Sequence, residues 1–245
     1  LRLIFTLLSC TIFFSYSNIT LPLIETPLLY NLINEPWLKY VVLIFLLTSV
    51  INGMNIIDGT NGLVGMAAST ALISLGIISF NIDDYLIFSI SLLFIILIYG
   101  FLFFNYPLGK IFLGDAGAYW LGWTISIITI VFYGRHPELP SWGASLVLFY
   151  PSMEVLFSVL RKISTKKNPL KPDENHLHLR LYFLLEKKLI DKRLANNAVM
   201  PLLATVWLVP QLLLLYSYRD IDMIMASFFA CIFIYVFIYK LSMIK

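Results

Sequence analysis

The sequence predicts an all-α, polytopic transmembrane helical bundle of about eight spans. Of its 245 residues, 60% are hydrophobic and only 13% are charged, far from the composition of a water-soluble domain. Apolar stretches long enough to cross a bilayer recur along the whole chain. The basic residues gather on alternate loops, as is typical of a multi-pass membrane protein. A net charge of +3 is too small to indicate a nucleic-acid-binding protein.

Eight apolar stretches are the expected spans, because roughly 20 apolar residues in a helix cross the hydrocarbon core. They cover about residues 2–18, 38–57, 61–80, 85–105, 117–134, 142–160, 198–217 and 223–240. Only a short polar turn separates the second stretch from the third. The sequence shows no repeat and no low-complexity tract, so we treat residues 1–245 as a single integral membrane domain.

The loops between these spans divide the basic residues unequally. If every span crosses, 14 of the 17 Lys and Arg residues share one side: Arg2, Lys110, Arg161, Lys162, Lys166, Lys167, Lys171, Arg180, Lys187, Lys188, Lys192, Arg193, Lys240 and Lys245. Only Lys39, Arg135 and Arg219 lie on the other side. Because basic loops stay in the cytoplasm, residues 161–197 are expected to form a basic cytoplasmic loop.

The first polar motif, "NGMNIIDGTNGL" at residues 52–63, interrupts two apolar stretches. Asn52, Asn55 and Asp58 are spaced by three, so the end of a helix would place them along one face. A carboxylate with two amides can bind a metal ion or hydrogen-bond a nucleobase edge. A capped helix–turn–helix is the alternative, but a cap needs one polar residue and this turn has several, including Asn61.

The second motif, "NYPLGKIFLGDAGAYWLG" at residues 105–122, ends in an expected span. The backbone amides at the start of that helix, together with Lys110, would attract phosphate. Asp115 would repel phosphate unless a divalent cation lay between them. The motif therefore indicates Mg²⁺, with a simple N-cap role for Asp115 as the alternative.

The third motif, "KPDENHLHLRLY" at residues 171–182, lies in the basic loop. His176 and His178, followed by Arg180, suit a metal pair, hydrogen bonds to phosphate or general acid–base chemistry. No cysteine or third histidine is close in sequence, which argues against a structural zinc site. A solvated loop is the alternative.

Two further ionisable residues stand apart from these motifs. Glu154 falls inside the expected span 142–160, where an ionisable residue indicates a functional site, and Arg161 is its expected partner. His136, on the opposite side, is expected to be only solvated.

The residues alone therefore predict an enzyme that acts on a soluble, phosphorylated substrate at the membrane surface. A transporter of lipid-linked sugars is a second hypothesis, although it should place its ionisable residues near the middle of the bilayer. An inactive remnant of an enzyme is a third.

The three motifs, in this order and on alternate cytoplasmic loops, resemble those of the polyprenyl-phosphate N-acetylhexosamine-1-phosphate transferases (glycosyltransferase family 4). That family includes the enzymes that initiate peptidoglycan, teichoic acid and O-antigen lipid intermediates. The resemblance implies transfer of an amino-sugar phosphate from a UDP-sugar to a polyprenyl phosphate such as undecaprenyl phosphate, with release of UMP. It also implies Mg²⁺ or Mn²⁺, the bacterial inner membrane and a site that faces the cytoplasm; a homodimer is left open.

The resemblance also implies roles for particular residues. Asp115 would ligate the metal ion with Asn55, Asp58 would line the nucleotide and metal site, and Phe112 would lie near the uracil. The two histidines would contact the diphosphate or the sugar. The remaining residues of the expected binding set are Asn52, Asn61, Lys110 and Arg180.

Two positions depart from the family pattern. Asn61 stands where the family usually has a second aspartate. The acidic pair that the family carries on an earlier cytoplasmic loop has no counterpart, because Asp83 and Asp84 fall on the opposite side. We therefore expect that the chain lacks amino-terminal spans, and that these 245 residues alone would have little or no activity.

Overall fold

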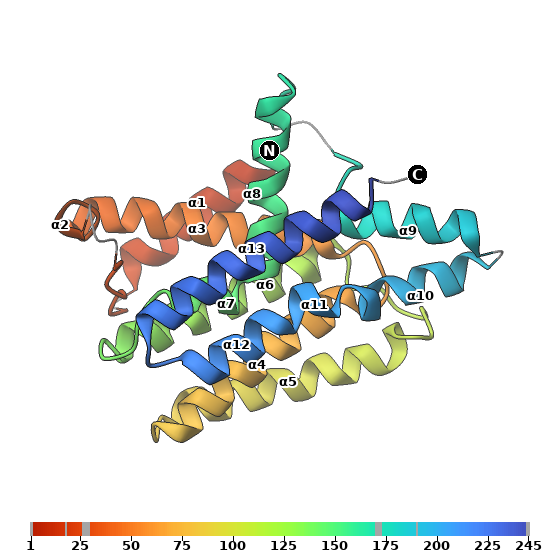
Figure 1. Ribbon diagram of the computed structural model, residues 1–245. Coiled ribbons are helices and arrows are strands. Elements are labelled where there is room, and N and C mark those ends of the chain that lie inside the picture. Colours follow the sequence, from red (N-terminus) through yellow and green to blue (C-terminus); the bar gives the residue numbers. More distant parts are fainter. Residues whose placement is uncertain (1, 18, 26–29, 170–172, 190, 244–245) are drawn as a thin grey trace.

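The structure is a computed structural model that describes residues 2–17, 19–25, 30–169, 173–189 and 191–243. The described residues form helices and no strand (Figure 1). The helices are α1 (Arg2–Tyr16), α2 (Tyr30–Ile33), α3 (Pro36–Ile57), α4 (Leu63–Asn81), α5 (Tyr85–Asn105), α6 (Gly114–Arg135), α7 (Gly143–Val147), α8 (Phe149–Ser164), α9 (Leu177–Lys188), α10 (Lys192–Leu202), α11 (Ala204–Trp207), α12 (Val209–Ser217) and α13 (Ile221–Leu241).

The predicted polytopic helical bundle is confirmed, but the count of eight spans is not. Among the described residues, six helical segments are long and apolar enough to cross a membrane: α3, α4, α5, α6, the α10–α12 segment Lys192–Ser217, and α13. The expected span at 2–18 is a shorter apolar helix, Leu3–Tyr16. The expected span at 198–217 begins earlier, because Asp191 accepts hydrogen bonds from two backbone amides of the first turn of α10.

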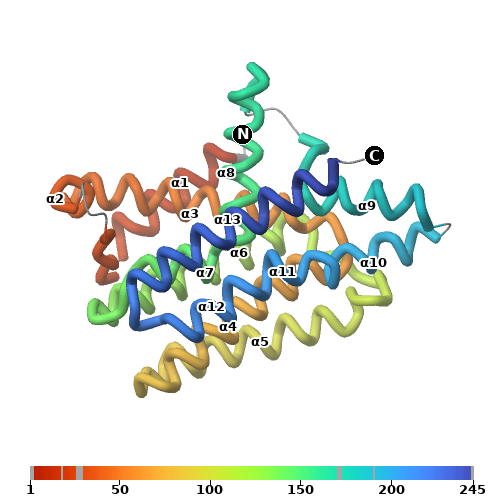
Figure 2. The backbone as a smooth tube through the Cα atoms, in the orientation of Figure 1, coloured from red at the N-terminus to blue at the C-terminus, as the bar shows by residue number. Residues whose placement is uncertain are grey.

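The expected span at 142–160 is broken, and proline chemistry explains the break. Pro151 lies in the first turn of α8 and has no N–H to donate to the carbonyl group four residues earlier, at Val147. The Gln211 amide of α12 instead donates to the carbonyl oxygens of Leu146 (2.9 Å) and Val147 (3.1 Å). The chain changes direction there, and α8 runs steeply across the other long helices (Figure 2).

Helix α4 lies at the centre of the bundle, with most of its residues buried. It packs against α5, α6 and α12. Its small side chains, among them Ala67, Ala68 and Ala71, let neighbouring helices approach closely. Ser74 of α4 also donates a 2.7 Å hydrogen bond to the side chain of Gln211. Gln211 is the residue that caps the carbonyl groups at the end of α7, so α4 helps to position this cap.

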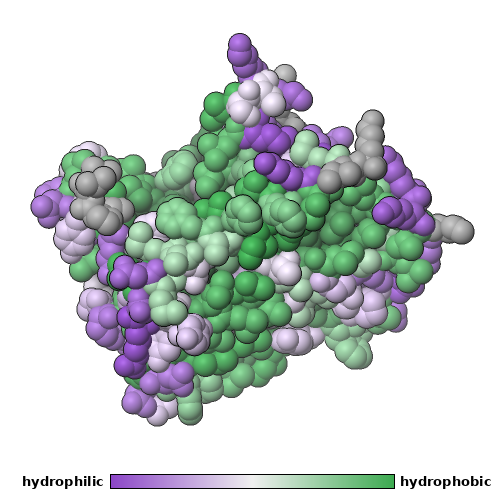
Figure 3. All heavy atoms as spheres, viewed as in Figure 1, coloured by the Kyte–Doolittle hydropathy of each residue, from purple (hydrophilic) through white to green (hydrophobic). Residues whose placement is uncertain are grey.

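The two ends of the bundle are polar and the surface between them is apolar. Figure 3 shows green across the middle of the visible face and purple towards its two ends. At one end lie the α3–α4 turn, the 106–113 loop, α9 and the start of α10; at the other lie the α4–α5, α6–α7 and α12–α13 connections (Figure 1). Lys171 and Lys245, which the charge argument counts, lie outside the described residues.

Candidate functional site

The first motif forms the turn between α3 and α4. Helix α3 ends at Ile57, and its last turn places Asn55 and Asp58 three residues apart at the same end. Gly62 closes the turn with φ = +79°, a left-handed conformation that glycine adopts without strain. A Cβ atom on Gly62 would also lie 2.9 Å from the ring of Tyr106, so the turn and the second motif are in direct contact.

The second motif is the loop between α5 and α6, and Asn105 fastens it to the turn. The side-chain oxygen of Asn105, Oδ1, accepts a 2.7 Å hydrogen bond from the backbone N–H of Gly62. Its amide nitrogen donates to the backbone oxygen of Ile111 at 2.8 Å. The loop leads into α6 at Gly114, which leaves Asp115 in the first turn of that helix.

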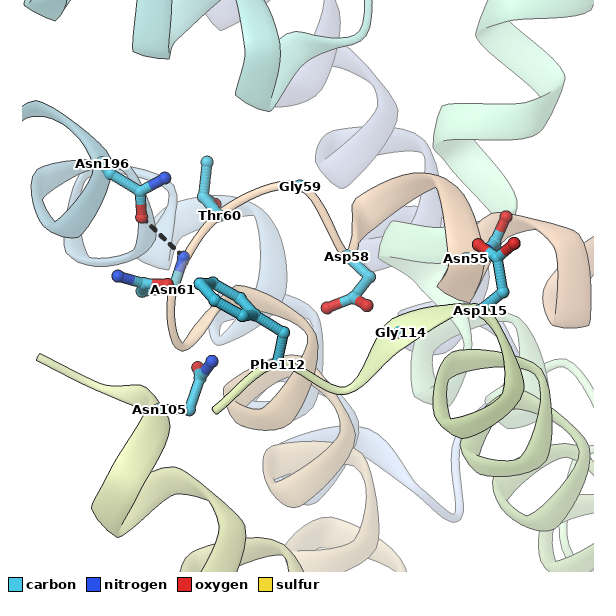
Figure 4. A pocket seen from close by; sticks show the side chains of 10 residues that line it. All are labelled: Asn55, Asp58, Gly59, Thr60, Asn61, Asn105, Phe112, Gly114, Asp115 and Asn196. Carbon is cyan, nitrogen blue, oxygen red and sulfur yellow. Dashed lines mark hydrogen bonds between the residues drawn. The ribbon is translucent and has the colours of Figure 1, made fainter. Parts of the chain in front are cut away.

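These two segments, together with Asn196 of α10, form a pocket of about 220 Å³ (Figure 4). It is lined by Asn55, Asp58, Gly59, Thr60, Asn61, Asn105, Phe112, Gly114, Asp115 and Asn196. On one side, the Asn55 amide donates a 2.8 Å hydrogen bond to Asp115. Figure 4 shows the Asp58 carboxylate between this pair and the Phe112 ring. The structure therefore brings together five residues that the sequence predicts for the site: Asn55, Asp58, Asn61, Phe112 and Asp115.

The electrostatics of the pocket centre on Asp58. Burial, with a smaller contribution from the negative charge of Asp115, raises the pKa of Asp58 from 3.8 to about 6. The backbone N–H of Gly114 donates to the same carboxylate and offsets part of this effect. Two carboxylates thus face one pocket at an energetic cost that a bound cation would relieve.

The donor chemistry of this pocket fits Mg²⁺. Its side-chain ligands would be oxygen atoms of Asp58, Asp115 and Asn55, which a hard cation prefers. Among the described residues, no group of three or more His, Cys, Asp or Glu side chains is placed to hold a metal ion. Protein-bound Mg²⁺ needs no such group, since it commonly uses one or two carboxylates with water and substrate phosphates.

The histidines of the third motif lie beside the pocket rather than in its lining. His176 precedes α9 and His178 lies in its first turn, and their rings stack with centroids 6.0 Å apart. A Cβ atom on Gly59 would lie 2.6 Å from His178 Nε2, so this ring touches the rim of the pocket. Burial lowers the pKa of His178 to about 4, which leaves the imidazole neutral at physiological pH.

Besides the two histidines, three further predicted residues lie away from the pocket lining. Asn52 donates to the backbone oxygen of Thr48 at 2.7 Å, within α3. Lys110 is exposed in the 106–113 loop. Arg180 donates to the Ser242 hydroxyl (3.2 Å) and to its backbone oxygen (3.1 Å), which ties α9 to the end of α13. Their assignment to the substrate site stays a prediction.

The structure corrects the expected partner of Glu154. Its carboxylate lies 3.0 Å from His176 Nδ1, whereas Arg161 pairs with Asp173. Glu154 is buried in α8, and its nearest nitrogen belongs to His176, the residue before α9 and 22 positions away in sequence. Burial alone would raise the pKa of Asp173. Hydrogen bonds from Ser158 and the backbone N–H of Asn175, together with the ion pair with Arg161, instead hold it well below its usual range.

The sequence suggested that His136 is only solvated, but the structure shows that both of its ring nitrogens have partners. Its Nε2 lies 2.8 Å from Asp84 and its Nδ1 lies 3.0 Å from Glu138. Arg135 donates to Asp84 as well, at 2.9 Å. This ionic group joins the start of α5 to the end of α6, at the end of the bundle opposite to the pocket.

Sequence reasoning missed three polar residues that line the pocket: Thr60, Asn105 and Asn196. The first two stand inside the quoted motifs, so their position was the available signal. Asn196 had none, because it reaches the turn only through the fold: its side chain accepts a 2.8 Å hydrogen bond from the backbone N–H of Asn61. Asn197 next to it accepts one from the Asn61 amide at 2.9 Å.

The fold and this pocket define a class, a multi-pass helical membrane protein with a polar, carboxylate-bearing site at one end. The model of the family described as glycosyl transferase family 4 matches residues 1–133, more than half of the chain. The chain belongs to glycosyl transferase family 4.

Three curated relatives give the family its context. A probable undecaprenyl-phosphate N-acetylglucosaminyl 1-phosphate transferase of Bacillus subtilis (strain 168) is 29% identical over 193 residues, which cover 75% of this chain and 54% of that protein. An undecaprenyl-phosphate alpha-N-acetylglucosaminyl 1-phosphate transferase of Thermotoga maritima is 35% identical over 129 residues, or 53% of this chain and 38% of that protein. A phospho-N-acetylmuramoyl-pentapeptide-transferase of Bacillus subtilis is 28% identical over 177 residues, or 70% and 53%. The chain thus spans about half the length of these relatives or less.

Proposed function

We propose that this chain forms part of a transferase that moves an N-acetylhexosamine-1-phosphate from a UDP-sugar to a polyprenyl phosphate and releases UMP. We take its 245 residues as one integral membrane domain, with the pocket and residues 161–197 on the cytoplasmic side of a bacterial inner membrane. The family and the names of the relatives support the reaction class. The observation that carries the proposal is the pair of carboxylates, Asp58 and Asp115, facing one pocket beside the Asn55 amide.

The proposed reaction needs little covalent chemistry from the protein. A phosphate oxygen of the lipid attacks the phosphorus that bears the sugar, the bond from that phosphorus to the bridging oxygen breaks, and UMP leaves with that oxygen. Positioning and neutralisation of charge therefore account for most of the catalysis. Mg²⁺ bound by Asp58, Asp115 and Asn55 would supply this neutralisation.

The other residues would hold and orient the donor. Phe112 is 75% exposed at the edge of the pocket, which suits an aromatic ring that stacks on a uracil base. His176 and His178 would contact the diphosphate or the sugar from the Gly59 side. The apolar surface of the bundle suits the polyprenyl tail of the acceptor, because that tail would lie in the bilayer that surrounds the bundle.

The experiment is an assay of UMP release by membranes that contain the natural full-length protein. UDP-N-acetylglucosamine is the first donor, undecaprenyl phosphate is the acceptor, and Mg²⁺ is titrated after treatment with EDTA. Release of UMP should require both the lipid and the metal ion. No release under any of these conditions, with UDP-N-acetylgalactosamine included, would support an inactive remnant or a transporter instead.

Asp115→Asn is the decisive variant in this assay. It preserves the size of the side chain but removes its charge. Turnover should fall ~100-fold or more, because a metal ligand contributes several kcal/mol of charge stabilisation. The matched control is Asp222→Asn, since Asp222 also lies in the first turn of a helix, α13, at the other end of the bundle. The structure already excludes the helix-cap alternative, because Leu113 is the N-cap of α6 and Asp115 lies inside the first turn. Mg²⁺ titration curves for Asp115→Asn that superimpose on the wild-type curves would show that Asp115 does not bind the metal ion.

A further inference from the structure

Glu154 is a buried carboxylate that takes no part in the steps of the proposed reaction. It is 1% exposed and lies in α8, outside the lining of the pocket. Among the described residues, no lysine or arginine forms an ion pair with it, because Arg161 is engaged with Asp173. A buried carboxylate without a cationic side chain beside it is costly, so a chain that retains one commonly uses it.

The contact that Glu154 does make is with His176. Its Oε2 atom lies 3.0 Å from His176 Nδ1. Its Oε1 atom is buried without a hydrogen bond within the described part of the chain, and the hydroxyls of Tyr150 and Tyr235 lie close by without normal hydrogen-bond geometry. His176 is thus the well-formed partner of the carboxylate.

This contact determines what His176 can offer to a substrate. Because an ionised carboxylate only accepts hydrogen bonds, Nδ1 carries the proton between the two groups whenever Glu154 is ionised. Nε2 is then the nitrogen left for another group, as a donor when the ring is protonated and as an acceptor for a hydroxyl when it is neutral. His176 itself precedes α9 with extended backbone (φ −67°, ψ 147°), so the helix does not orient its ring.

A continuous set of contacts joins this pair to the pocket. The His176 ring stacks on that of His178 at an interplanar angle of 14°, and His178 touches Gly59 at the pocket rim. Glu154 holds His176, the other ring of the stack. Helix α8, which carries Glu154, packs against α3 and so keeps the carboxylate in place. The carboxylate can therefore act on the site without reaching it.

We infer that Glu154 is a positioning residue of the proposed transferase: it holds His176 with Nδ1–H towards α8, so that Nε2 meets an oxygen of the sugar-phosphate donor. The inference rests on the proposed function for the identity of that donor. Glu154 acts through His176, in the way that a carboxylate hydrogen-bonded to the second ring nitrogen of a metal-bound histidine orients that histidine.

The first test is a double-mutant cycle on UMP release by the natural full-length protein. Glu154→Gln keeps the shape and removes the charge, and should lower turnover about 10- to 100-fold, with a smaller change in KM for the UDP-sugar. In the double variant with His176→Ala, Glu154→Gln should cause no further loss of turnover, because the imidazole through which Glu154 acts is absent. The control is Glu186→Gln, the same change on α9 in a glutamate that pairs with Lys192, and its turnover should equal that of the wild type.

The cycle separates positioning from a general structural role. Losses that multiply in the double variant, or full turnover in Glu154→Gln, would overturn the inference. If Glu154→Gln does not accumulate in the membrane, Glu154→Asp replaces it in the same cycle. That variant keeps the charge on a shorter side chain, and it too should lose turnover alone but not on top of His176→Ala.

A second test does not depend on turnover. Nitrogen-15 NMR of histidine-labelled protein in bilayers reports which ring nitrogen carries the proton, and the signals absent from His176→Ala identify His176. The wild type should show the Nδ1–H form, and Glu154→Gln should lose it or mix it with the Nε2–H form. An unchanged tautomer in Glu154→Gln would overturn the inference even if UMP release occurs; absence of UMP release from the wild type would overturn only the proposed function.

Discussion

Asp58 carries an energetic cost that a purely structural residue would not. Its pKa in the folded protein is about 6 against an ordinary 3.8, with burial as the main cause. The folded state therefore binds this proton more tightly than the unfolded state, so stability is lost as the pH rises from about 4 to about 6. Metal-free protein at pH 8 carries the full cost, which binding of a cation would remove.

Asp58→Asn should remove that cost and most of the activity together. In EDTA at pH 8, we expect the variant to be more stable than the wild type by about 1–2 kcal/mol, a value reduced for the partial exposure of the carboxylate. The advantage should vanish near pH 3.5, where wild-type Asp58 is protonated. Thermal unfolding in detergent at both pH values measures it, and an equal difference at the two would contradict the assigned pKa.

His178 makes the opposite contribution to the pH dependence. Burial lowers its pKa from 6.5 to about 4, so the unfolded chain binds this proton first as the pH falls. Stability should therefore decline between pH 6.5 and pH 4, by about 3 kcal/mol from this residue. His178→Gln should show a shallower decline over that interval in thermal unfolding. Parallel curves for the two proteins would mean that His178 titrates normally.

At the scale of residues, sequence patterns predicted those side chains that short segments bring together. Asn55 and Asp58 share a helix end, and Phe112 and Asp115 are three residues apart where the loop enters α6, so spacing and family resemblance sufficed. Asn196 and the Glu154–His176 pair depend on contacts between distant segments. No local pattern encodes such a contact, so it became visible only in the fold.

Among the elements, the contact of α3 with α8 controls the position of Glu154. A Cβ atom on Gly53 would lie 2.2 Å from the backbone oxygen of Pro151, so even alanine would force the helices apart. Gly53→Ala should destabilise the protein by about 1–3 kcal/mol, despite the better helix propensity of alanine, and should lower UMP release.

Gly100→Ala on α5 is the matched control for that variant. Nothing lies within 4 Å of a Cβ atom at Gly100, so alanine should be neutral or stabilising by up to about 1 kcal/mol. Thermal unfolding of the two variants in the same detergent measures the difference. Equal stability for Gly53→Ala and Gly100→Ala would show that α8 can move away from α3 at little cost.

Hydropathy predicted most of the long helices but not the path of the chain around α8. Residues 142–160 are apolar enough to suggest a span, yet Pro151 breaks the helix and Gln211, some 60 residues on, caps the break. An average over a window cannot detect a change of direction. Window averaging also failed to predict the early start of α10, because the cap at Asp191 extends that helix into polar sequence.

Across the whole molecule, the structure and the charge pattern divide the protein along the same axis. The pocket, the histidines and the starts of α9 and α10 lie at the end where the described basic loops gather. The Asp84–Arg135–His136 group marks the other end. The basic end is therefore the one expected in the cytoplasm, where a nucleotide-activated sugar is available.

This orientation can be tested with single cysteines, since the native Cys10 and Cys231 are both buried. Ser164 is exposed at the end of α8, in the basic segment, and Glu138 is exposed in the α6–α7 connection. In spheroplasts, a membrane-impermeant thiol reagent should label a cysteine at 138 but label one at 164 only after permeabilisation, because the charge pattern puts the basic segment 161–197 on the cytoplasmic side. Cys10→Ser/Cys231→Ser protein without an added cysteine provides the background. Labelling of 164 before permeabilisation, with 138 protected, would invert the topology and place the pocket where no nucleotide sugar could reach it, so the proposed donor would fall with it.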